Sequence, residues 1–283
     1  MGLAVSAAFS YAVTVVLNRS LAGDVEAAAV LSVRFGVAGV GLLGLLAVQG
    51  RSLLPAPGER WRVFLLGLVG YGAESTVFFA ALERGTTAAV SLLFYTYPAV
   101  VTVLEWGLGR APVDRRRVVA LGLSTAGTAL VIAAAGGVSI SRVGVVVALC
   151  ASGSFAVYLL ASEAWVRRTD ALTTGAWVAV GATVSMAVRG AVTGSLAPAP
   201  GHWAELVANG LATSFAFGLM FAALRRIGAG PTAVVMTLEA FFAIVLAAVF
   251  LDEGLRPLQG VGGLAILAAT VLIARARRTP VEV

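Results

Sequence analysis

Phe79-Ala80-Ala81-Leu82 recurs as Phe221-Ala222-Ala223-Leu224, 142 positions later in the chain. Arg84 and Arg226 stand at equivalent positions after the two copies, so the third and eighth apolar segments align with each other. Each copy of this repeat contains five apolar segments. Because five is odd, a chain that crosses a membrane at each segment ends every copy on the side opposite its start. Two inverted copies that meet near the bilayer midplane are a recurring plan of secondary transporters.

The composition indicates a membrane protein. Hydrophobic residues make up 59% of the 283 residues and charged residues only 12%. A soluble domain of this length cannot bury so much apolar surface, so lipid must cover most of it. A helix that crosses a bilayer needs about 20 apolar residues. We expect an all-α integral membrane protein with ten transmembrane helices, at about 2–17, 27–48, 61–82, 86–106, 118–135, 143–164, 173–192, 203–224, 230–250 and 258–274.

The two repeats are predicted to meet at Gly136-Gly137, which separate the fifth span from the sixth. We therefore expect one five-helix repeat at 1–137 and a second, inverted one at 138–283. Little of the chain remains outside the ten spans. A soluble catalytic or receptor domain is therefore not expected.

The basic residues predict the orientation. All 20 cations are arginine, and the net charge is +6. If the N-terminus is cytoplasmic, 14 arginines fall on the cytoplasmic side and five outside, while Arg34 lies within the second span. Basic residues accumulate in the cytoplasmic loops of membrane proteins. We expect an N-in/C-in, multi-pass protein of the cytoplasmic (inner) membrane of a prokaryote.

Several kinds of site are excluded or not expected. Without lysine there is no P-loop, so ATP is not an expected partner, and there is no Schiff-base cofactor. His202 is the only histidine and lies in a loop, so no metal or haem site is expected. The lone Cys150 excludes an internal disulfide. No cofactor or nucleic acid is expected. Glu105, Glu163 and Arg189 lie near predicted helix ends and are expected to be solvated.

Four short motifs occur in order along the chain: Leu31-Ser32-Val33-Arg34-Phe35, Leu93-Phe94-Tyr95-Thr96-Tyr97-Pro98-Ala99-Val100, Leu238-Glu239-Ala240 and Phe250-Leu251-Asp252-Glu253. Together with the doubled layout, they resemble the drug/metabolite transporter (DMT) superfamily, in particular its ten-helix members with two EamA repeats. The resemblance implies a central cavity walled by spans 1–4 and 6–9, with spans 5 and 10 peripheral. The family's Glu-Pro pair is Glu239-Ala240 here, and the acidic end of the fourth span is Gly109-Arg110.

Small polar residues follow one face of the first span and of the sixth. They stand four residues apart, which places them along one side of a helix. They are Ser6, Ser10, Thr14 and Asn18 in the first span, and Cys150, Ser154, Tyr158 and Ser162 in the sixth. Ser10, Thr14 and Tyr158 are therefore candidates for lining a shared aqueous path. Hydrogen bonds between helices, or from Ser and Thr to their own helix carbonyls, are the alternative.

Two carboxylates are predicted near the bilayer midplane. Glu74 lies between Tyr71 and Phe78 on one face of the third span, and Glu239 lies at comparable depth in the ninth. A charge there costs roughly 2.5–3.5 kcal/mol on insertion scales, so it must be protonated, paired or facing water. Both carboxylates are candidates for proton coupling or for solute contact. A structural ion pair with Arg34 is the alternative, and we expect Arg34 itself to have a structural role.

The fourth and eighth spans carry the remaining candidates for the cavity. Tyr95 and Tyr97 can stack on a solute or donate hydrogen bonds to it, and Pro98 marks a bend because it cannot donate to the preceding turn. Thr213 and Phe217 form a comparable polar and aromatic line in the eighth span. Ordinary packing between helices explains these residues equally well.

We expect a secondary transporter that moves a small organic metabolite, amino-acid-like or amphiphilic, by alternating access and in the direction of export. Its partners would be the solute and the lipid bilayer, with protons as an open option. Two other transport functions remain: a proton-coupled exporter of lipophilic cations and a lipid-carrier flippase subunit. An enzyme is not expected. The enzymatic alternative is an intramembrane hydrolase that uses Ser152 or Ser154 with His202 as the base.

Overall fold

The computed structural model describes residues 1–21, 24–110, 114–194, 201–250 and 256–276. Regular secondary structure within these ranges is helical, and one isolated bridge joins Gly85 to Ile140. The helices, in chain order, are α1 (Gly2–Leu21), α2 (Ala27–Val48), α3 (Arg60–Leu65), the π-helix η1 (Leu66–Tyr71), α4 (Gly72–Leu82), α5 (Thr87–Phe94), α6 (Tyr97–Gly107), α7 (Arg115–Ala135), α8 (Arg142–Trp165), α9 (Ala171–Thr193), α10 (Trp203–Ile227), α11 (Ala229–Met236), α12 (Leu238–Phe250) and α13 (Pro257–Ala276).

Ten helical segments are long and apolar enough to cross a membrane, which confirms the predicted all-helical membrane fold. Three of these spans are not single α-helices. The third combines α3, η1 and α4, the fourth combines α5 and α6, and the ninth combines α11 and α12. Asp252 and Glu253, which belong to the last of the four sequence motifs, lie outside the described residues.

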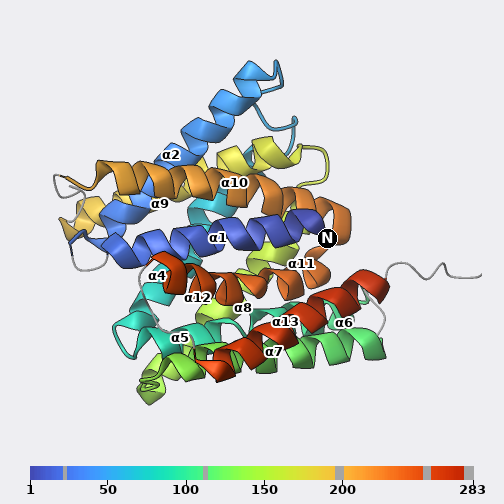
Figure 1. Cartoon of the computed structure of the whole chain (residues 1–283). Coiled ribbons are helices and arrows are strands. Elements are labelled where there is room, and N and C mark those ends of the chain that lie inside the picture. The colour runs from blue at the N-terminus through green and yellow to red at the C-terminus, as the bar shows by residue number, and fades with distance from the viewer. Residues whose placement is uncertain (22–23, 111–113, 195–200, 251–255, 277–283) are drawn as a thin grey trace, which may run out of the picture.

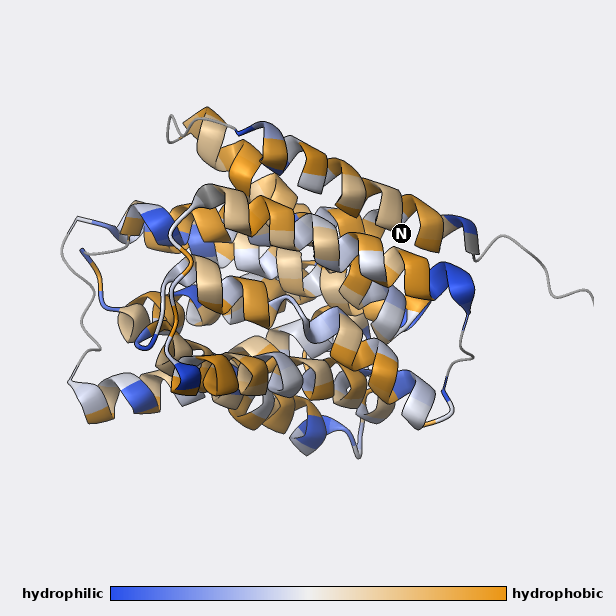
Figure 2. Ribbon diagram, turned by 90° about the horizontal axis from the view of Figure 1, so that it is seen from below, coloured by the Kyte–Doolittle hydropathy of each residue, from blue (hydrophilic) through white to orange (hydrophobic). Residues whose placement is uncertain are grey.

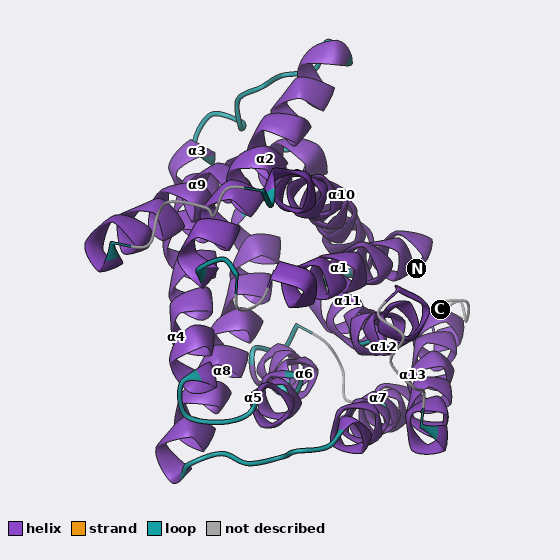
Figure 3. Cartoon of the chain, turned by 60° about the vertical axis from the view of Figure 1, so that its left-hand side comes forward, coloured by secondary structure: helices purple, strands orange, loops and turns teal. Residues whose placement is uncertain are grey.

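The helices form a layered bundle in which the fifth and tenth spans stand apart. In Figure 3, α7 and α13 lie side by side at one edge, and α2 and α9 lie at the opposite edge. Between these edges, α1 packs against α10 and α12, whereas α8 packs against α4, α5 and α6 (Figure 1). The first helix of each predicted half therefore contacts mainly helices of the other half.

The surface of the bundle matches a lipid environment. Large apolar side chains remain uncovered on the outside, among them Phe215 at 66% and Leu264 at 68% exposure. Figure 2 shows hydrophobic residues along the length of the helices and hydrophilic residues gathered towards both ends. Because helices satisfy their own backbone hydrogen bonds, such spans are stable in hydrocarbon.

Short polar side chains define where several spans begin. Asp114 accepts a hydrogen bond from the backbone amide of Arg116 at the start of α7, and Ser141 accepts one from Gly144 at the start of α8. Asp170 accepts bonds from the amides of Leu172 and Thr173 at the start of α9. Each cap satisfies amides that the first helical turn leaves without partners.

Glycines bring α7 and α13 into close contact. A Cβ built on Gly127 would lie 2.6 Å from the carbonyl oxygen of Gly262, and a Cβ on Gly262 would lie 2.5 Å from the carbonyl oxygen of Gly127. Neither position therefore has room for a side chain. Small residues that allow such close approach are characteristic of helix pairs in membranes.

We expect Gly127→Val to destabilise the protein by about 1–3 kcal/mol, because α7 and α13 must separate to fit the side chain. Thermal unfolding of the purified protein in detergent measures the change. Gly122→Val is the matched control, since a Cβ at Gly122 meets no atom within 4 Å. Equal melting temperatures for the two variants would contradict the reciprocal glycine contact.

Candidate functional site

An aromatic cluster fills the middle of the bundle and contains most of the predicted cavity residues. The Tyr71 ring lies 5.4 Å from the Phe217 ring and 5.6 Å from the Tyr158 ring, measured between centroids. Tyr95 and Tyr97 lie 6.2 Å apart. The rings of Phe94 and Phe155 connect these two groups, and the Phe94 ring also lies against Phe78. The structure thus brings together side chains from η1, α4, α5, α6, α8 and α10.

Arg34 and the two predicted carboxylates lie within this cluster. The Arg34 side chain is buried, and its Nε donates a hydrogen bond to Thr213 Oγ1 at 2.7 Å. Glu74 is buried and accepts a hydrogen bond from Ser75 Oγ at 3.2 Å. Glu239 faces Tyr95 and lies within electrostatic range of Arg34, yet it keeps part of its surface accessible. No ion pair within 4.0 Å joins Arg34 to either carboxylate, all three being described residues. The direct ion pair, which was the alternative to proton coupling or solute contact, is therefore absent, and the Arg34 guanidinium donates to Thr213 instead.

The spacing of the polar residues places them on one face of α1 and one face of α8, but the residues of each face do not share one environment. Ser10 Oγ donates to the carbonyl of Ser6 at 2.9 Å, and Thr14 Oγ1 donates to the carbonyl of Tyr11 at 2.8 Å. Both bonds lie within α1, as in the alternative that the sequence left open. A place for Ser10 and Thr14 in a solute path stays a prediction. Cys150 is exposed, in contrast to buried Tyr158 on the same helix.

The fourth and ninth spans both break, at threonines that lie 141 positions apart in the sequence. Thr96 stands between α5 and α6, next to Tyr95, and Thr237 stands between α11 and α12. The Thr96 hydroxyl donates to the carbonyl of Leu93 at 2.6 Å, and the Thr237 hydroxyl donates to the carbonyl of Val234 at 2.7 Å. Each hydroxyl thus binds a carbonyl in the preceding turn, where the regular helix stops.

Only the first of these breaks has a proline beside it. Pro98 occupies the first turn of α6 and lacks the amide that a continuous helix needs. In the ninth span, Ala240 replaces the proline, and the chain nevertheless breaks at Thr237. The sequence motif did not predict this second break. In the 142-residue repeat Thr237 corresponds to Tyr95, which lies at the break in the fourth span.

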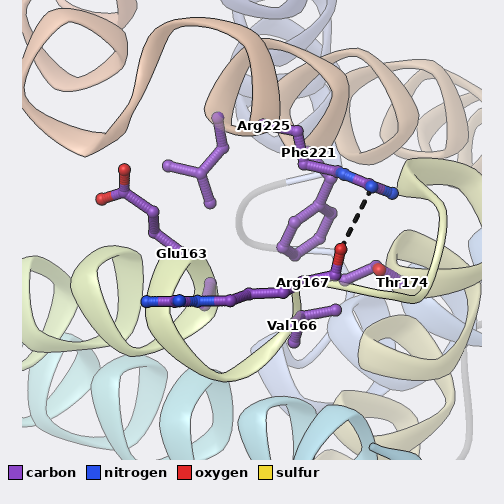
Figure 4. Close-up of a pocket in the computed structure, with 8 residues that line it drawn as sticks. Glu163, Val166, Arg167, Thr174, Phe221 and Arg225 are labelled. Carbon is purple, nitrogen blue, oxygen red and sulfur yellow. Dashed lines mark hydrogen bonds between the residues drawn. The ribbon is translucent and has the colours of Figure 1, made fainter. Parts of the chain in front are cut away.

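Two cavities open at opposite ends of the bundle. The α8–α10 cavity, of about 230 Å³, lies between the ends of α8 and α10 and the start of α9 (Figure 4). The α2–α4 cavity, of about 380 Å³, lies between the start of α2 and the ends of α4 and α9. Residues 142 positions apart line the two cavities, with Phe79, Leu82 and Glu83 in one and Phe221, Leu224 and Arg225 in the other.

The end of the bundle that holds the α8–α10 cavity also holds a cluster around Glu59. The Glu59 carboxylate accepts hydrogen bonds from the amides of Arg167 at 3.0 Å, Arg168 at 2.9 Å and Thr169 at 2.8 Å. The Thr169 hydroxyl donates a fourth, at 2.7 Å. Burial alone would raise the pKa of Glu59, but the bonds from Thr169, Arg168 and Arg167 outweigh it and lower this pKa from 4.5 to about 2.

Further contacts hold the loop before α3 to the start of α9. Arg51 forms an ion pair with Asp170 at 2.9 Å, and Trp177 Nε1 donates to the carbonyl of Leu53 at 2.8 Å. The loop belongs to the first predicted half, and Asp170 and Trp177 belong to the second. The Glu59 cluster and these two bonds therefore join the halves at one end of the bundle.

The EamA-like transporter family model matches residues 1–133 and 142–275. The chain belongs to this family. Family members are transporters, so membership implies that this chain transports small solutes across a membrane. A comparison with curated proteins finds no match.

Solved structures show the same fold. Among 29 matching chains is one described only as the crystal structure of a protein. It aligns with a TM-score of 0.85 over 98% of each chain, at 19% sequence identity. At this identity the likeness shows the fold alone.

Three ionisable residues differ from their expected solvation in this EamA-like transporter. Glu105 is buried and accepts a hydrogen bond from the amide of Gly230 at 2.8 Å, because the turn that starts α11 covers it. Glu163 is partly buried and lines the α8–α10 cavity. Arg189 is also partly buried, and its guanidinium lies 5.4 Å from the centre of the Phe79 ring. Their positions near helix ends suggested solvation, but neighbouring helix ends cover them.

The residues proposed for an intramembrane hydrolase do not form a nucleophile–base pair among the described residues. Ser152 Oγ lies 3.0 Å from Thr96 Oγ1, at the break between α5 and α6. His202 precedes α10 without capping it. Within the described ranges, no hydrogen bond joins His202 to Ser152 or Ser154. The family membership and this geometry both favour transport.

We expect Glu59→Gln to lower the free energy of unfolding by about 3 kcal/mol at neutral pH, since the amide cannot replace a carboxylate that accepts four hydrogen bonds. The pKa of Glu59 is lower in the folded protein than in the unfolded chain. Its stabilisation is therefore complete above about pH 4.5 and disappears as the pH falls towards 2. The variant should lack this acid dependence in thermal unfolding between pH 7 and pH 2.

Glu26→Gln is the control for this experiment, because Glu26 begins α2 without a side-chain cap bond. It should melt as the parent protein does at neutral pH. A Glu59→Gln protein with unchanged melting and an unchanged acid transition would contradict the role assigned to the cluster.

Proposed function

We propose that this EamA-like protein is a secondary transporter for a small organic metabolite, amino-acid-like or amphiphilic, and that it works by alternating access. It would act as an exporter in the cytoplasmic membrane of a prokaryote, with both termini in the cytoplasm. Repeats 1–137 and 138–283 would lie inverted around the central cluster. Glu74 and Glu239 would face a solute or a proton there.

The paired breaks at Thr96 and Thr237 carry this proposal. Discontinuous helices that meet at the midplane form the solute sites of many secondary transporters. Here Thr237 lies at the repeat equivalent of Tyr95, one residue from the equivalent of Thr96, and close in sequence to Glu239. At a short break, the chain can change direction without disrupting the helices on either side. Such a pair would allow one half to rock against the other.

The two end cavities support the same mechanism. Their walls include repeat-equivalent residues, and they lie at opposite ends of the bundle. Inverted repeats exchange their conformations when a transporter changes from one open state to the other. The α8–α10 cavity and the α2–α4 cavity would then be the mouths of two alternating pathways.

An exporter of lipophilic cations is a second candidate, favoured by the charge and ring content of the central cluster. Glu74 and Glu239 carry two carboxylates against the single guanidinium of Arg34, and aromatic rings surround them. Aromatic faces attract organic cations. Exchange assays with amino acids and with cationic dyes separate the two candidates.

If Glu239 or Glu74 carries the coupled proton, its replacement by glutamine should abolish solute uptake driven by a pH gradient, because an amide does not bind and release protons. Exchange of labelled for unlabelled solute without a gradient should persist. Proteoliposomes loaded with amino acids, nucleosides or cationic dyes measure both activities. Glu205→Gln, in the first turn of α10, is the control. Intact pH-driven uptake in both Glu239→Gln and Glu74→Gln would rule out proton coupling through these groups.

The break in the ninth span can be tested at Thr237. Thr237→Val keeps the shape of the side chain but removes the hydroxyl that binds the Val234 carbonyl. We expect solute exchange to slow several-fold while solute affinity stays unchanged, since the break no longer has its hydrogen bond. Thr237→Ser restores the hydroxyl and should restore the rate. A Thr237→Val protein with the parent exchange rate would remove this break from the mechanism.

A further inference from the structure

Arginine residues gather at one end of the pair formed by α7 and α13. Residues 115–117, all arginine, begin α7, and Arg275 lies in the last turn of α13. Ala120, near the start of α7, packs in one cluster with Ile273, near the end of α13. The reciprocal glycine contact lies farther along α7 and earlier in α13, so the two helices run antiparallel. The arginines at 115–117 and Arg275, which we call the basic end, therefore lie at the same end of the pair.

Acidic groups neutralise only part of this positive charge. Arg117 Nη1 lies 3.8 Å from Glu105 Oε2, and the Asp114 carboxylate caps the first turn of α7. The side chains of Arg115 and Arg275 are exposed, and neither makes a hydrogen bond or an ion pair with a described residue. Two of the four guanidinium groups of the basic end are thus left for a partner outside the protein.

Other arginines at this end of the bundle are used inside the protein. Arg51 forms its ion pair with Asp170, and Arg225 donates to the carbonyls of Thr169 and Arg167. These arginines hold the loop before α3 and the turn after α8 in place. The basic end has no comparable internal role, because Arg115 and Arg275 contact no carbonyl or carboxylate of a described residue.

The charge of the α7–α13 pair is also unevenly distributed along its length. At the end opposite to the basic end, α7 stops at Ala135 with no basic residue in its last turn. Arg256 precedes α13 there, and a Cβ built on Gly136 would lie 3.9 Å from its Nη1. Among the described residues of the pair, the basic charge is therefore concentrated at one face of the membrane.

Exposed apolar side chains adjoin the basic end on both helices. Val118 and Val119 follow the arginines of α7 and are each 45% exposed, and Val271 lies one turn before Arg275 and is 50% exposed. The apolar surface continues along α13 to Leu264. The pair lies at an edge of the bundle (Figure 3), where lipid covers such side chains. Positive charge is thus followed, along both helices, by surface that suits an acyl chain.

We propose that the basic end binds the headgroup phosphate of an anionic phospholipid, whose acyl chains lie along the exposed faces of α7 and α13. Guanidinium groups donate charge-assisted hydrogen bonds to phosphate. Clusters of basic residues next to a transmembrane helix attract anionic lipids. A free phosphate ester shares the headgroup chemistry but gains nothing from the apolar surface. The lipid site lies apart from the central cluster and from both end cavities, so it does not depend on the identity of the solute.

The test is a titration of the full chain in detergent with dioleoyl phosphatidylglycerol, in which native mass spectrometry counts the bound lipid. Dioleoyl phosphatidylcholine has the same acyl chains but no net charge and is titrated in parallel. An arginine near an anionic headgroup contributes about a factor of five to binding, so the two exposed arginines should favour phosphatidylglycerol roughly ten- to thirtyfold. Equal affinity for the two lipids would overturn the proposal.

A double variant assigns the lipid to the basic end. Arg115→Gln together with Arg275→Gln should bind phosphatidylglycerol about as weakly as phosphatidylcholine, with parent melting in detergent. Arg62→Gln together with Arg168→Gln is the matched control, since it removes two exposed arginines from the same end of the bundle but outside the α7–α13 pair. The control should keep the preference for phosphatidylglycerol. Parent affinity in the first double variant, or an equal loss in both, would overturn the proposal.

Two further measurements separate a lipid from a free phosphate ester and from contact by acyl chains alone. Glycerol 3-phosphate should not displace phosphatidylglycerol when the two are equally concentrated, because it cannot use the apolar surface. Displacement under these conditions would make the phosphate group alone the ligand and overturn the lipid assignment. An increase in salt from about 0.05 M to about 0.5 M should weaken phosphatidylglycerol several-fold, since exposed charges are screened. Binding that is independent of salt would overturn the proposal.

Discussion

Backbone hydrogen bonding in hydrocarbon is the constraint on which this structure depends. An amide or carbonyl without a partner costs several kcal/mol there, so the spans must be helical. Interruptions are tolerated where protein surrounds them. Both breaks obey this rule, since Tyr97 and Thr237 are buried and the hydroxyls of Thr96 and Thr237 bind carbonyls in the preceding turn. Side chains thus replace part of the regular helical bonding inside the bundle.

The same constraint explains why polar groups gather at the centre. Arg34 is buried and needs a partner, and Thr213 provides one across the boundary between the predicted halves. Glu74 and Glu239 lie within electrostatic range of this guanidinium. Surrounding rings then fill the remaining volume and exclude lipid. Packing of α1 and α8 against the opposite halves brings these groups together from distant parts of the sequence.

The sequence predicted the fold well because length and hydropathy determine where spans lie. The spacing along single helices, together with the family resemblance, also made Tyr71, Tyr158 and Phe217 candidates for one cavity, and their rings lie close together. Contacts across the bundle were harder to predict. The spacing of Ser10 and Thr14 could not show that they bind their own helix. The role of Glu59 depends on a turn more than 100 positions away, so no local pattern could reveal its partners.

The Glu59 carboxylate holds the turn after α8 through several hydrogen bonds at once. Its four hydrogen bonds end on three consecutive residues, 167–169. Once one bond forms, the others are made at high effective concentration, so they form and dissociate together. Separation of the two loops at this end of the bundle therefore requires the Glu59 carboxylate to lose all four bonds.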